Sequence, residues 1–476
     1  MTDATCTLQP PEHPEVAVRL TRSATSTGKF LSTSQCLEWL AERRAARGFL
    51  VERVPFDSLD GWTFSPSTGN LVHHSGRFFS VEGLHVFGYP GRVEEWYQPI
   101  IVQFEIGILG ILVKEFDGVL HCLMQAKMEP GNSNVVQLSP TVQATRSNYT
   151  RIHQGKPTPY LEYFMNPPPG AVLADSLQSE QGGWFLHKRN RNIVVETHDD
   201  VDLLEDYCWL TVGQIHQLMA IDNVVNMDAR TVLSCMPFAP NEERGDGGYA
   251  DALRRSLRGE EGARYTVTDA ISWLTANKAR CELVQERVPL DAVREWRRDD
   301  DEIGHIDGEF FKVVAVDVRA ASREVASWSQ PLLAPVAPGL LALLTRRIHG
   351  VLHVLMQARA AAGALDMIEI APTVHCMPHT YRDMSRSDWP RYLPYITDAD
   401  MRQIRYHAWL SEEGGRFLHA KNRYLVLEVD EDFPLDEPEN FRWLTVYQLM
   451  LLLRASNCLN VEARTLLAGL QTWLSR

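Results

Sequence analysis

The sequence predicts an α+β fold that occurs twice in tandem. Segments of the first half recur in the same order in the second: GVLHCLMQAK from Gly118 and GVLHVLMQAR from Gly350 share eight of ten residues at an offset of 232. The chain has 476 residues, more than the ~250–300 residues at which single cores stop growing. Strand-like runs in each half lie between helix signals, which is typical of α+β units. We therefore expect two copies of a mixed sheet flanked by helices.

Each copy is predicted to begin and end with a helix. Ser32-x-x-Gln35 precedes CLEWLAERRA, and Thr211-x-x-Gln214 and Thr445-x-x-Gln448 precede the closing helices. Such a pair is a capping box, which marks a helix start because the two side chains satisfy backbone N–H groups there. Between the helices of the first copy, five apolar, β-branched runs predict strands: FFSVEGLHVF, GILGILVKEF, VLHCLMQAK, NVVQLSPTVQAT and NIVVETH.

Composition indicates the boundaries between the copies. Residues 239–264 are polar, charged and rich in Gly, which predicts a linker. Residues 1–27 are rich in Thr, Ser and Pro and are expected to form a loose tail. The first repeat then covers residues 28–238 and the second covers residues 265–476.

Charge and cysteine content exclude several classes of protein. Acidic residues number 61 and basic residues 47, a formal net charge of −14, so no nucleic-acid partner is expected, because phosphate backbones need a basic surface. The sequence shows no apolar signal region and no apolar stretch long enough to predict a membrane span. The eight cysteines are scattered and form no CxxC pair, which is typical of reduced thiols in a cytoplasmic protein.

The main candidate site follows a strand with polar residues on one face. In HCLMQAK, alternation places His121, Gln125 and Lys127 on the same face. Glu129 and Asn132 follow in the adjoining turn. A cation, a carboxylate and an amide at a strand end suit the recognition of a polar ligand. The alternative interpretation is the solvent-exposed face of an edge strand.

Two further segments supply candidate side chains for binding. Arg146 can hold phosphate oxygens, and Tyr149, next to Asn148, can stack on a base or sugar. In GGWFLHKRNR, Trp184 can stack on a base, and His187 can act as an acid or base near neutral pH. The alternatives are an exposed basic loop and a hairpin with a basic tip. The remaining binding candidates are Trp96, Gln98, Thr141, Asn190 and Arg191.

The second half repeats much of this set and predicts a second pocket. Its candidates are Trp328, Gln330, His353, Gln357, Arg359, Tyr381, Arg382, His419, Asn422 and Arg423. The recurrence of these residues is also compatible with shared packing. No GxGxxG, P-loop, HExxH or GxSxG motif is present, and the histidines show no metal-ligand spacing. We therefore expect acid–base chemistry without a cofactor or a metal.

Four phrases carry a resemblance to a known family: LMQAKMEPGN, QLSPTVQATRSNY, SEQGGWFLHKRN and SEEGGRFLHAKNRY. At these phrases, and from about Phe30 to Leu470 overall, the chain resembles the NDP-hexose 2,3-dehydratase family of deoxysugar biosynthesis. The resemblance implies a fused pair of Nudix-like domains, a homodimer, and a dTDP-linked 4-keto-6-deoxyhexose as substrate. It also implies a 3,4-diketo-2,6-dideoxy product, passed to a 3-ketoreductase in pathways to antibiotics and other glycosylated natural products.

The implied reaction assigns roles to the candidate residues. A base removes the C3 proton that the C4 ketone acidifies, a cation or donor stabilises the enolate, and an acid assists departure of the C2 hydroxyl. The candidate bases are Glu129 and His187, and the candidate stabilisers or acids are Lys127 and His121. The phosphates are assigned to Arg146 with Arg191, and stacking to Trp96, Tyr149 and Trp184.

The first half is predicted to hold the active pocket. Its KMEPGN segment becomes Arg359-Ala360-Ala361-Ala362-Gly363-Ala364 in the second half, which loses the carboxylate and the amide. The second half is then a remnant that can still bind a nucleotide sugar. Two alternatives remain: a degenerate Nudix-type hydrolase, which the absence of G-x5-E-x7-R-E-x-x-E-E disfavours, and a non-catalytic nucleotide-sugar binding protein.

Overall fold

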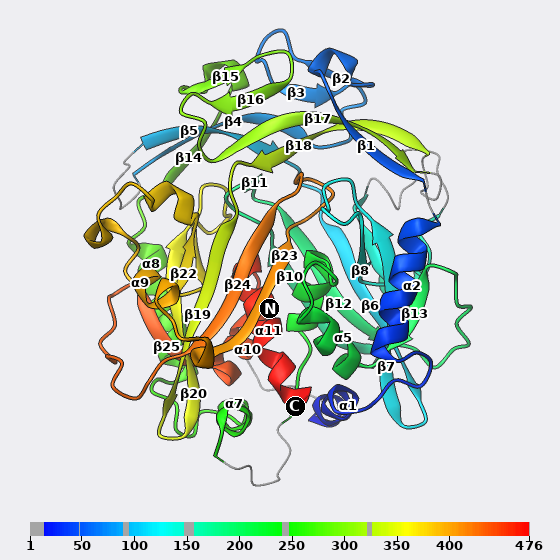
Figure 1. Ribbon diagram of the computed structural model, residues 1–476, viewed down its shortest axis with the longest axis vertical. Coiled ribbons are helices and arrows are strands. Elements are labelled where there is room, and N and C mark those ends of the chain that lie inside the picture. The colour runs from blue at the N-terminus through cyan, green and yellow to red at the C-terminus, as the bar shows by residue number, and fades with distance from the viewer. Residues whose placement is uncertain are drawn as a thin grey trace, which may run out of the picture.

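The two repeats interlock through four β-sheets. The computed structural model describes residues 14–46, 48–88, 95–146, 157–239, 247–320 and 326–475. In this part of the chain, two large sheets lie in the lower part of the molecule and two small sheets lie above them (Figure 1). The arrangement confirms an α+β fold with mixed sheets in duplicate.

Each repeat forms one large sheet. The first consists of β10 (Val172–Ser179), β12 (Arg189–Glu196), β6 (Gly107–Phe116), β7 (Val119–Met128) and β13 (Tyr207–Leu210), with β8 (Val136–Ser139) on β7 and β9 (Val142–Ala144) on β6. The second consists of β23 (Ile404–Ser411), β24 (Lys421–Glu428), β19 (Gly339–Ile348), β20 (Val351–Ala360) and β25 (Phe441–Thr445), with β21 (Ile368–Ala371) and β22 (Val374–Cys376). β12 runs parallel to β6, and β24 runs parallel to β19, whereas the other pairs within each sheet are antiparallel.

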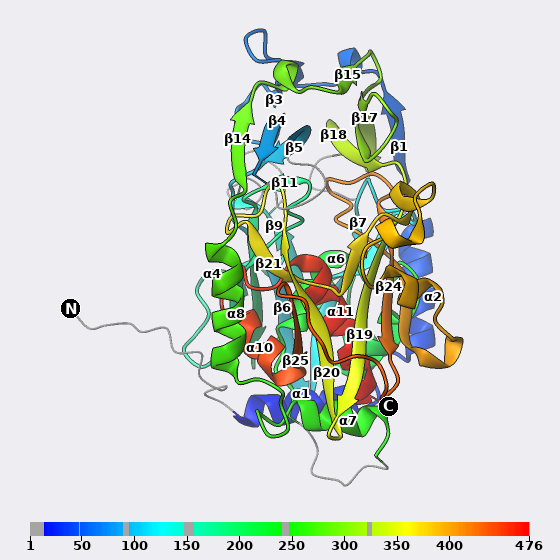
Figure 2. The same cartoon turned by 90° about the vertical axis from the view of Figure 1, so that its left-hand side faces the viewer.

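The small sheets exchange strands between the repeats. One contains β11 (Phe185–Leu186), β5 (Glu95–Val102), β4 (Ser80–Phe87), β3 (Leu71–His73) and β2 (Trp62–Phe64), and it accepts β14 (Val284–Val288) from the second repeat. The other contains β17 (Phe311–Ala320), β18 (Ser327–Pro335), β16 (Glu302–His305) and β15 (Trp296–Arg298), and it accepts β1 (Phe49–Val54) from the first repeat. Figure 2 shows β14 beside β4 and β1 beside β17. Each small sheet is therefore completed by the other repeat.

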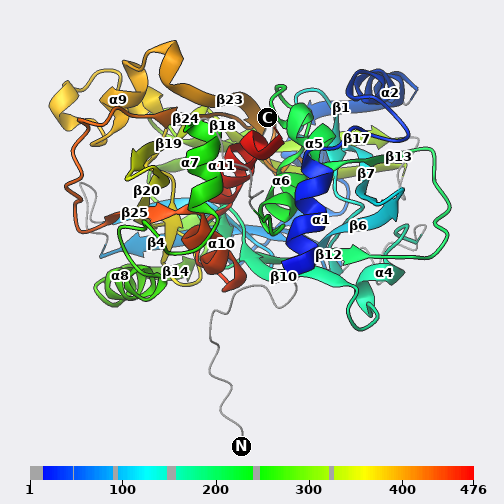
Figure 3. The same cartoon turned by 90° about the horizontal axis from the view of Figure 1, so that it is seen from below.

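Helices pack against the large sheets and between them (Figure 3). Those of the first repeat are α1 (Pro14–Ala24), α2 (Thr33–Ala45), α4 (Glu162–Met165), α5 (Val212–Met219) and α6 (Met227–Ser234). Those of the second are α7 (Tyr249–Ser256), α8 (Val267–Ala279), α9 (Leu393–Thr397), α10 (Val446–Arg454) and α11 (Val461–Gln471). Short 3₁₀ turns lie at Phe56–Ser58, Leu290–Ala292, Pro378–Tyr381, Arg386–Asp388, Met401–Gln403 and Thr472–Ser475. α6 packs on α11, and one apolar core cluster includes Leu138 and Leu233 of the first repeat with Ile370 and Leu467 of the second.

The capping boxes and most of the strands are confirmed, but the tail and the linker contain ordered helices. The boxes at Ser32, Thr211 and Thr445 begin α2, α5 and α10. α1 lies within the segment expected to be a loose tail. It is held against the first repeat because Ser23 Oγ donates to the Leu120 carbonyl of β7 (2.6 Å) and accepts from Val212 N (2.9 Å). In the expected linker, Ser256 of α7 makes the same pair of bonds to β20 and α10. These helices are thus the first elements of the two repeats.

In the described residues, no helix combines the length and the apolar character needed to cross a membrane.

Candidate active site

The turn that carries Glu129 docks onto a loop of the opposite repeat. Gly131 N donates to the Gly414 carbonyl (2.7 Å), and His419 N donates to the Gly131 carbonyl (2.7 Å). A Cβ on Gly131 would overlap the Phe417 carbonyl oxygen, so glycine is required by close backbone approach. The candidate site around Glu129 is therefore built by both repeats.

The equivalent turn of the second repeat docks in the same way. Gly363 N donates to the Gly182 carbonyl (2.5 Å), and His187 N donates to the Gly363 carbonyl (2.7 Å). The molecule thus holds two related sites, and each combines a turn of one repeat with a Gly-Gly loop of the other. Glu129 and His187 therefore belong to different sites, and each site borrows residues from the other half.

Three amide side chains hold the Glu129 carboxylate. Gln143 Nε2 donates to Oε1 (2.7 Å), and Asn132 Nδ2 and Asn226 Nδ2 donate to Oε2 (3.2 and 3.4 Å). Glu129 is only 3 % exposed. Amide donors stabilise an ionised carboxylate and fix its direction. Lys127, whose Nζ donates to the Gln143 carbonyl (3.0 Å), brings a cation to the same place.

The second repeat contributes Glu413 and Arg416 to this site. Glycine at 415 leaves room beside both carboxylates: a Cβ there would lie 3.4 Å from Glu413 Oε1 and 3.7 Å from Glu129 Oε1. Arg416 lies over the Phe79 ring (4.3 Å from the guanidinium carbon to the centroid), and its Nε donates to Gln103 Oε1 (3.2 Å). We call the charged residues gathered here the Glu129 cluster: Lys127, Glu129, Glu180, Lys188, Asp228, Glu413 and Arg416.

Burial shifts the proton affinities within the Glu129 cluster. Desolvation raises the pKa of Glu413 to about 7, and it raises the pKa values of Asp228 and Glu180. Desolvation also lowers the pKa of Lys188, whose Nζ donates to the Glu105 carbonyl. The cluster therefore places buried acids with raised pKa values beside a carboxylate held by donors, an arrangement typical of general acid–base sites.

Several buried acceptor atoms of the site lack a partner among the described residues. Asp228 is 3 % exposed and Asn132 is 2 % exposed, and the Oδ1 atoms of both are unpaired. Oε2 of Glu180 and Oε2 of Glu413 are also buried and unpaired. Each such atom costs ~1–3 kcal/mol, so the arrangement favours a ligand that supplies donors, as sugar hydroxyls do. Within the described residues, no three His, Cys, Asp or Glu side chains are placed to hold a metal ion.

The counterpart cluster in the other site has lost most of these charges. Equivalent positions in the two copies lie 232 or 234 residues apart. Four charged residues are replaced: Glu129 by Ala361, Glu413 by Gln181, Arg416 by Trp184 and Lys188 by Ala420. Three keep their charge: Lys127 as Arg359, Glu180 as Glu412 and Asp228 as Glu462. Desolvation raises the pKa of Glu462 to about 8, and it lowers the pKa of the neighbouring His375. The counterpart cluster therefore retains buried acids but lacks the facing pair of carboxylates.

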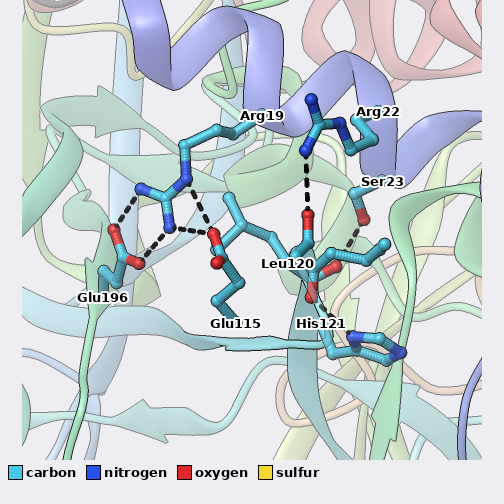
Figure 4. A network of polar contacts seen from close by, with 9 residues as sticks. Arg19, Arg22, Ser23, Glu115, Leu120, His121 and Glu196 are labelled. Carbon is cyan, nitrogen blue, oxygen red and sulfur yellow. Dashed lines mark hydrogen bonds and ion pairs between the residues drawn. The ribbon is translucent and has the colours of Figure 1, made fainter.

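His121 lies far from the Glu129 cluster, so the structure does not bring these two predicted catalytic groups together. Its Nε2 accepts from Lys29 N (3.3 Å), and its Nδ1 bonds the Val119 carbonyl (3.0 Å). Figure 4 shows the ring beside Leu120, near α1. The strand from His121 to Glu129 spans about 26 Å at ~3.3 Å per residue. His353 makes the same contacts with Arg264 N and the Val351 carbonyl, so the recurrence reflects shared packing.

Trp184 and His187 line the counterpart site. The Trp184 ring packs against Phe417 (4.4 Å between centroids) within the apolar core between the small sheets. His187 Nε2 bonds Gln285 Oε1 (2.7 Å) on β14. The loop that carries them docks onto the Gly363 turn of the second repeat, whereas the Glu129 turn docks onto the loop at Gly414.

Other predicted binding residues are occupied by structural hydrogen bonds. Thr141 Oγ1 accepts from Leu112 N (2.8 Å) and donates to the Leu123 carbonyl (2.5 Å), which links β6 to β7. Asn190 joins Gly107 N to Glu180, and Asn422 joins Gly339 N to Glu412. Arg191 makes a bidentate pair with Asp175 (2.9 and 2.6 Å).

The recurring Trp and Gln pairs support the Gly-Gly loops. Trp96 Nε1 donates to Gln98 Oε1 (2.9 Å), and Gln98 Nε2 donates to the Gly183 carbonyl (2.8 Å). Trp328 and Gln330 repeat this chain, which ends at the Gly415 carbonyl (2.8 Å). These contacts tie both tryptophans to the loops and do not show them as stacking platforms for a base. Gln330 supports the loop that carries Glu413.

The remaining candidates differ in position. Gln125 is half-buried and shares its strand face with Lys127, as predicted, and Arg146 is exposed after β9. Asn148 and Tyr149 lie outside the described residues. In the second half, Gln357 and Arg359 occupy the places on β20 that correspond to Gln125 and Lys127, and His419 is exposed beside the Glu129 turn. Arg382 contacts Asp383 and His379, Arg423 contacts His407, and Tyr381 accepts at its carbonyl from Trp389.

Sequence reasoning missed Glu413, Asp228 and Lys188. The differences between the two copies held a signal: Glu413 replaces Gln181, and Lys188 is replaced by Ala420. Both changes fall in the segment in which Trp184 of the first copy is equivalent to Arg416 of the second. Charges present in one copy only distinguish the two sites. Glu413 and Glu129 are 284 positions apart, and only the fold brings them together.

Known proteins share this sequence over nearly its whole length. A family model described as NDP-hexose 2,3-dehydratase matches residues 33–236 and again residues 267–470. A dTDP-4-dehydro-6-deoxy-alpha-D-glucopyranose 2,3-dehydratase of Saccharopolyspora spinosa is 52% identical over 440 residues, covering 91% of this chain and 90% of the relative. An enzyme with the same description from Amycolatopsis orientalis is 49% identical, covering 97% of this chain and 95% of the relative. Another from Streptomyces violaceoruber is 48% identical, covering 91% of this chain and 96% of the relative. The chain belongs to the NDP-hexose 2,3-dehydratase family.

Proposed function

We propose that this chain removes the C2 hydroxyl of dTDP-4-keto-6-deoxy-D-glucose and yields the 3,4-diketo-2,6-dideoxyhexose nucleotide, which makes it a carbon–oxygen lyase. The observation that carries the proposal is the 48% to 52% identity to three relatives described by this 2,3-dehydratase activity, over at least 91% of the chain. The Glu129 cluster supports it, because elimination needs a base and an acid on either side of one carbon–carbon bond.

Glu129 is the proposed base. The C4 ketone acidifies the C3 proton, and the carboxylate held by Gln143, Asn132 and Asn226 removes it. Lys127 supplies the positive charge that stabilises the enolate. Departure of the C2 hydroxyl as water then forms the C2=C3 bond, and tautomerisation gives the diketone. Arg146, which is exposed and follows Gln143 by three residues, is the proposed contact for the diphosphate.

The counterpart site is proposed to be a non-catalytic remnant. It has Ala361 where the active site has the base, and Gln181 where the active site has Glu413. We also propose, from the family resemblance, that each repeat is Nudix-like and that the protein is a cytoplasmic homodimer. A 3-ketoreductase then consumes the unstable diketone on the way to an antibiotic or another glycosylated natural product.

The decisive experiment is turnover of dTDP-4-keto-6-deoxyglucose without added metal or nicotinamide, followed by trapping with a 3-ketoreductase and NADPH. The expected result is NADPH oxidation that depends on this protein and a 2-deoxy product by mass spectrometry. Release of dTMP on addition of Mg²⁺ would instead identify a Nudix-type hydrolase. Tight binding of the nucleotide sugar without either reaction would identify a binding protein.

A further inference from the structure

The Glu129 and Glu413 carboxyl groups both lie beside Gly415. Their Oε1 atoms lie 3.7 and 3.4 Å from the Cβ position of Gly415, and are therefore at most about 7 Å apart, which does not exceed the ~5–9 Å over which paired carboxyls act on one sugar. Glu413 is half-buried, and its Oε2 is buried without a hydrogen-bond partner among the described residues. Oε2 of Glu413 can therefore accept a hydrogen bond from a bound ligand, or donate one when the carboxyl is protonated.

We propose that Glu413, supplied by the second repeat, is the general acid that protonates the departing C2 hydroxyl. This inference rests on the dehydration proposed above and names the group that completes it. Glu129 removes the proton from C3 and the enolate forms. The C4 carbonyl then forms again, the enolate electron pair becomes the C2=C3 bond, and the C2–O bond breaks as the Glu413 proton passes to the oxygen. Water leaves, with Glu129 protonated and Glu413 ionised.

The same two groups then complete tautomerisation and return to their starting states. Glu413 takes the proton of the C3 hydroxyl, the C3 carbonyl forms, and Glu129 delivers its proton to C2. Atoms and electrons balance, so no co-reactant is required. The reaction therefore needs one carboxyl from each repeat, on opposite sides of the C2–C3 bond.

The surroundings of Glu413 favour the protonated form at the start of the cycle. Burial raises its pKa to about 7, and the negative charges of Glu180 and Glu129 act in the same direction, whereas Arg416 and Lys188 oppose them. Asp228, from α6, is a further buried acid that faces Glu413. The charged groups around Glu413 are thus Arg416 on its own loop, Glu180 and Lys188 beside β12, Glu129 after β7, and Asp228 on α6.

The test separates proton removal from loss of the hydroxyl. The substrate is incubated in D₂O, and deuterium at C3 of recovered substrate is measured together with trapped product. Glu413→Gln is expected to lower turnover by ~10²–10⁴-fold while C3 exchange continues, and Glu129→Gln is expected to abolish both. The wild-type kcat should fall above about pH 7 as Glu413 ionises, and Glu413→Gln should lack this alkaline limb.

Two results would overturn the assignment. Turnover of Glu413→Gln within threefold of wild type would exclude an acid role, and so would loss of C3 exchange together with turnover while the nucleotide sugar still binds. Failure of the wild-type protein to exchange or eliminate would instead remove the proposed function itself.

A second pair of variants keeps the test open if Glu413→Gln does not fold. Gly415→Ala places a methyl at ordinary contact distance between the two carboxyls, whereas the Cβ position of Gly183, its equivalent in the counterpart site, meets no atom within 4 Å. Gly415→Ala should lose turnover at unchanged Tm, and Gly183→Ala should retain it. Equal turnover of the two variants would contradict a reaction between Glu129 and Glu413.

Discussion

At the scale of single residues, the Glu129 site and its counterpart differ by substitutions on a shared scaffold. Arg416 and Trp184 occupy equivalent places, one over Phe79 and the other against Phe311 and Phe417. An aromatic side chain is therefore compatible with this kind of slot. Arg416 adds a fixed cation next to Glu129 and Glu413 in the Glu129 site.

Arg416→Trp should therefore remove catalysis without unfolding the protein. We expect Tm to change by a few degrees at most, because Trp packs against aromatic rings in the equivalent place. The value of kcat/KM should fall ~10²-fold or more, since the site loses charge stabilisation in a buried setting. Thermal unfolding and the coupled NADPH assay measure the two effects. A variant that keeps wild-type kcat/KM would show that the Arg416 charge plays no part.

The buried histidines predict loss of stability in acid. Burial lowers the pKa of His216 from its ordinary 6.5 to about 3, and its Nδ1 bonds Ser475 Oγ (2.6 Å). Between pH 6.5 and about 3 the unfolded chain binds a proton that the folded chain does not, so stability falls as pH falls through this window.

The free energy of unfolding should therefore drop by about 2 kcal/mol between pH 7 and pH 5 through His216 alone, at ~1.4 kcal/mol per pH unit below 6.5. Urea unfolding at both pH values measures this loss. His216→Asn should show a pH dependence smaller by that amount, although it is less stable at pH 7. Equal pH dependence of the two proteins would contradict a buried neutral imidazole.

At the scale of elements, the Gly-Gly loops depend on chains of hydrogen bonds from the small sheets. Gln330 on β18 donates to the Gly415 carbonyl, and Gln98 on β5 donates to the Gly183 carbonyl, both at 2.8 Å. The two glutamines have the same local role in different sites. Gln330 is thus a positioning residue for Glu413 and Arg416, whereas Gln98 supports the loop of the counterpart site.

Replacing the two glutamines by leucine should separate positioning from stability. Gln330→Leu and Gln98→Leu should lower Tm by similar amounts, because each removes the amide that links a tryptophan Nε1 to a loop carbonyl. Only Gln330→Leu should lower kcat, by ~10–100-fold, since small displacements of reacting groups slow the chemical step. A similar fall in kcat for both variants would show that the effect is general loosening.

Elements defined by interactions between residues close in the sequence were predictable. Elements defined by pairing between distant segments were not. The capping boxes of α2, α5 and α10 involve residues three positions apart, so the sequence displays them. The exchange of β1 and β14 does not appear in the sequence, because Val54 pairs with Ala315 and Val288 pairs with Gly83. For the same reason Glu129 was identifiable from its turn, whereas its partner Glu413 was not.

At the scale of the whole molecule, duplication has produced one interdependent body. Each repeat completes a small sheet of the other, and each Gly-Gly loop receives a turn of the other repeat. The buried Arg464 of α11 donates to Thr231 Oγ1 of α6 (2.7 Å) and to the Ser179 carbonyl (2.5 Å). A single repeat would expose these groups together with half of a shared core.

The two halves, separated between residues 239 and 247, should therefore fold only together. Expressed alone, each half lacks a sheet strand and exposes the shared core, so we expect aggregation or a molten state without cooperative unfolding. Co-expression should restore a 1:1 complex with substantial turnover, because the linker contributes no residue to the Glu129 cluster. Size-exclusion chromatography, near-UV circular dichroism and the coupled assay measure these outcomes. An isolated first half that unfolds cooperatively and eliminates the C2 hydroxyl would show that the second repeat, and Glu413 with it, is dispensable.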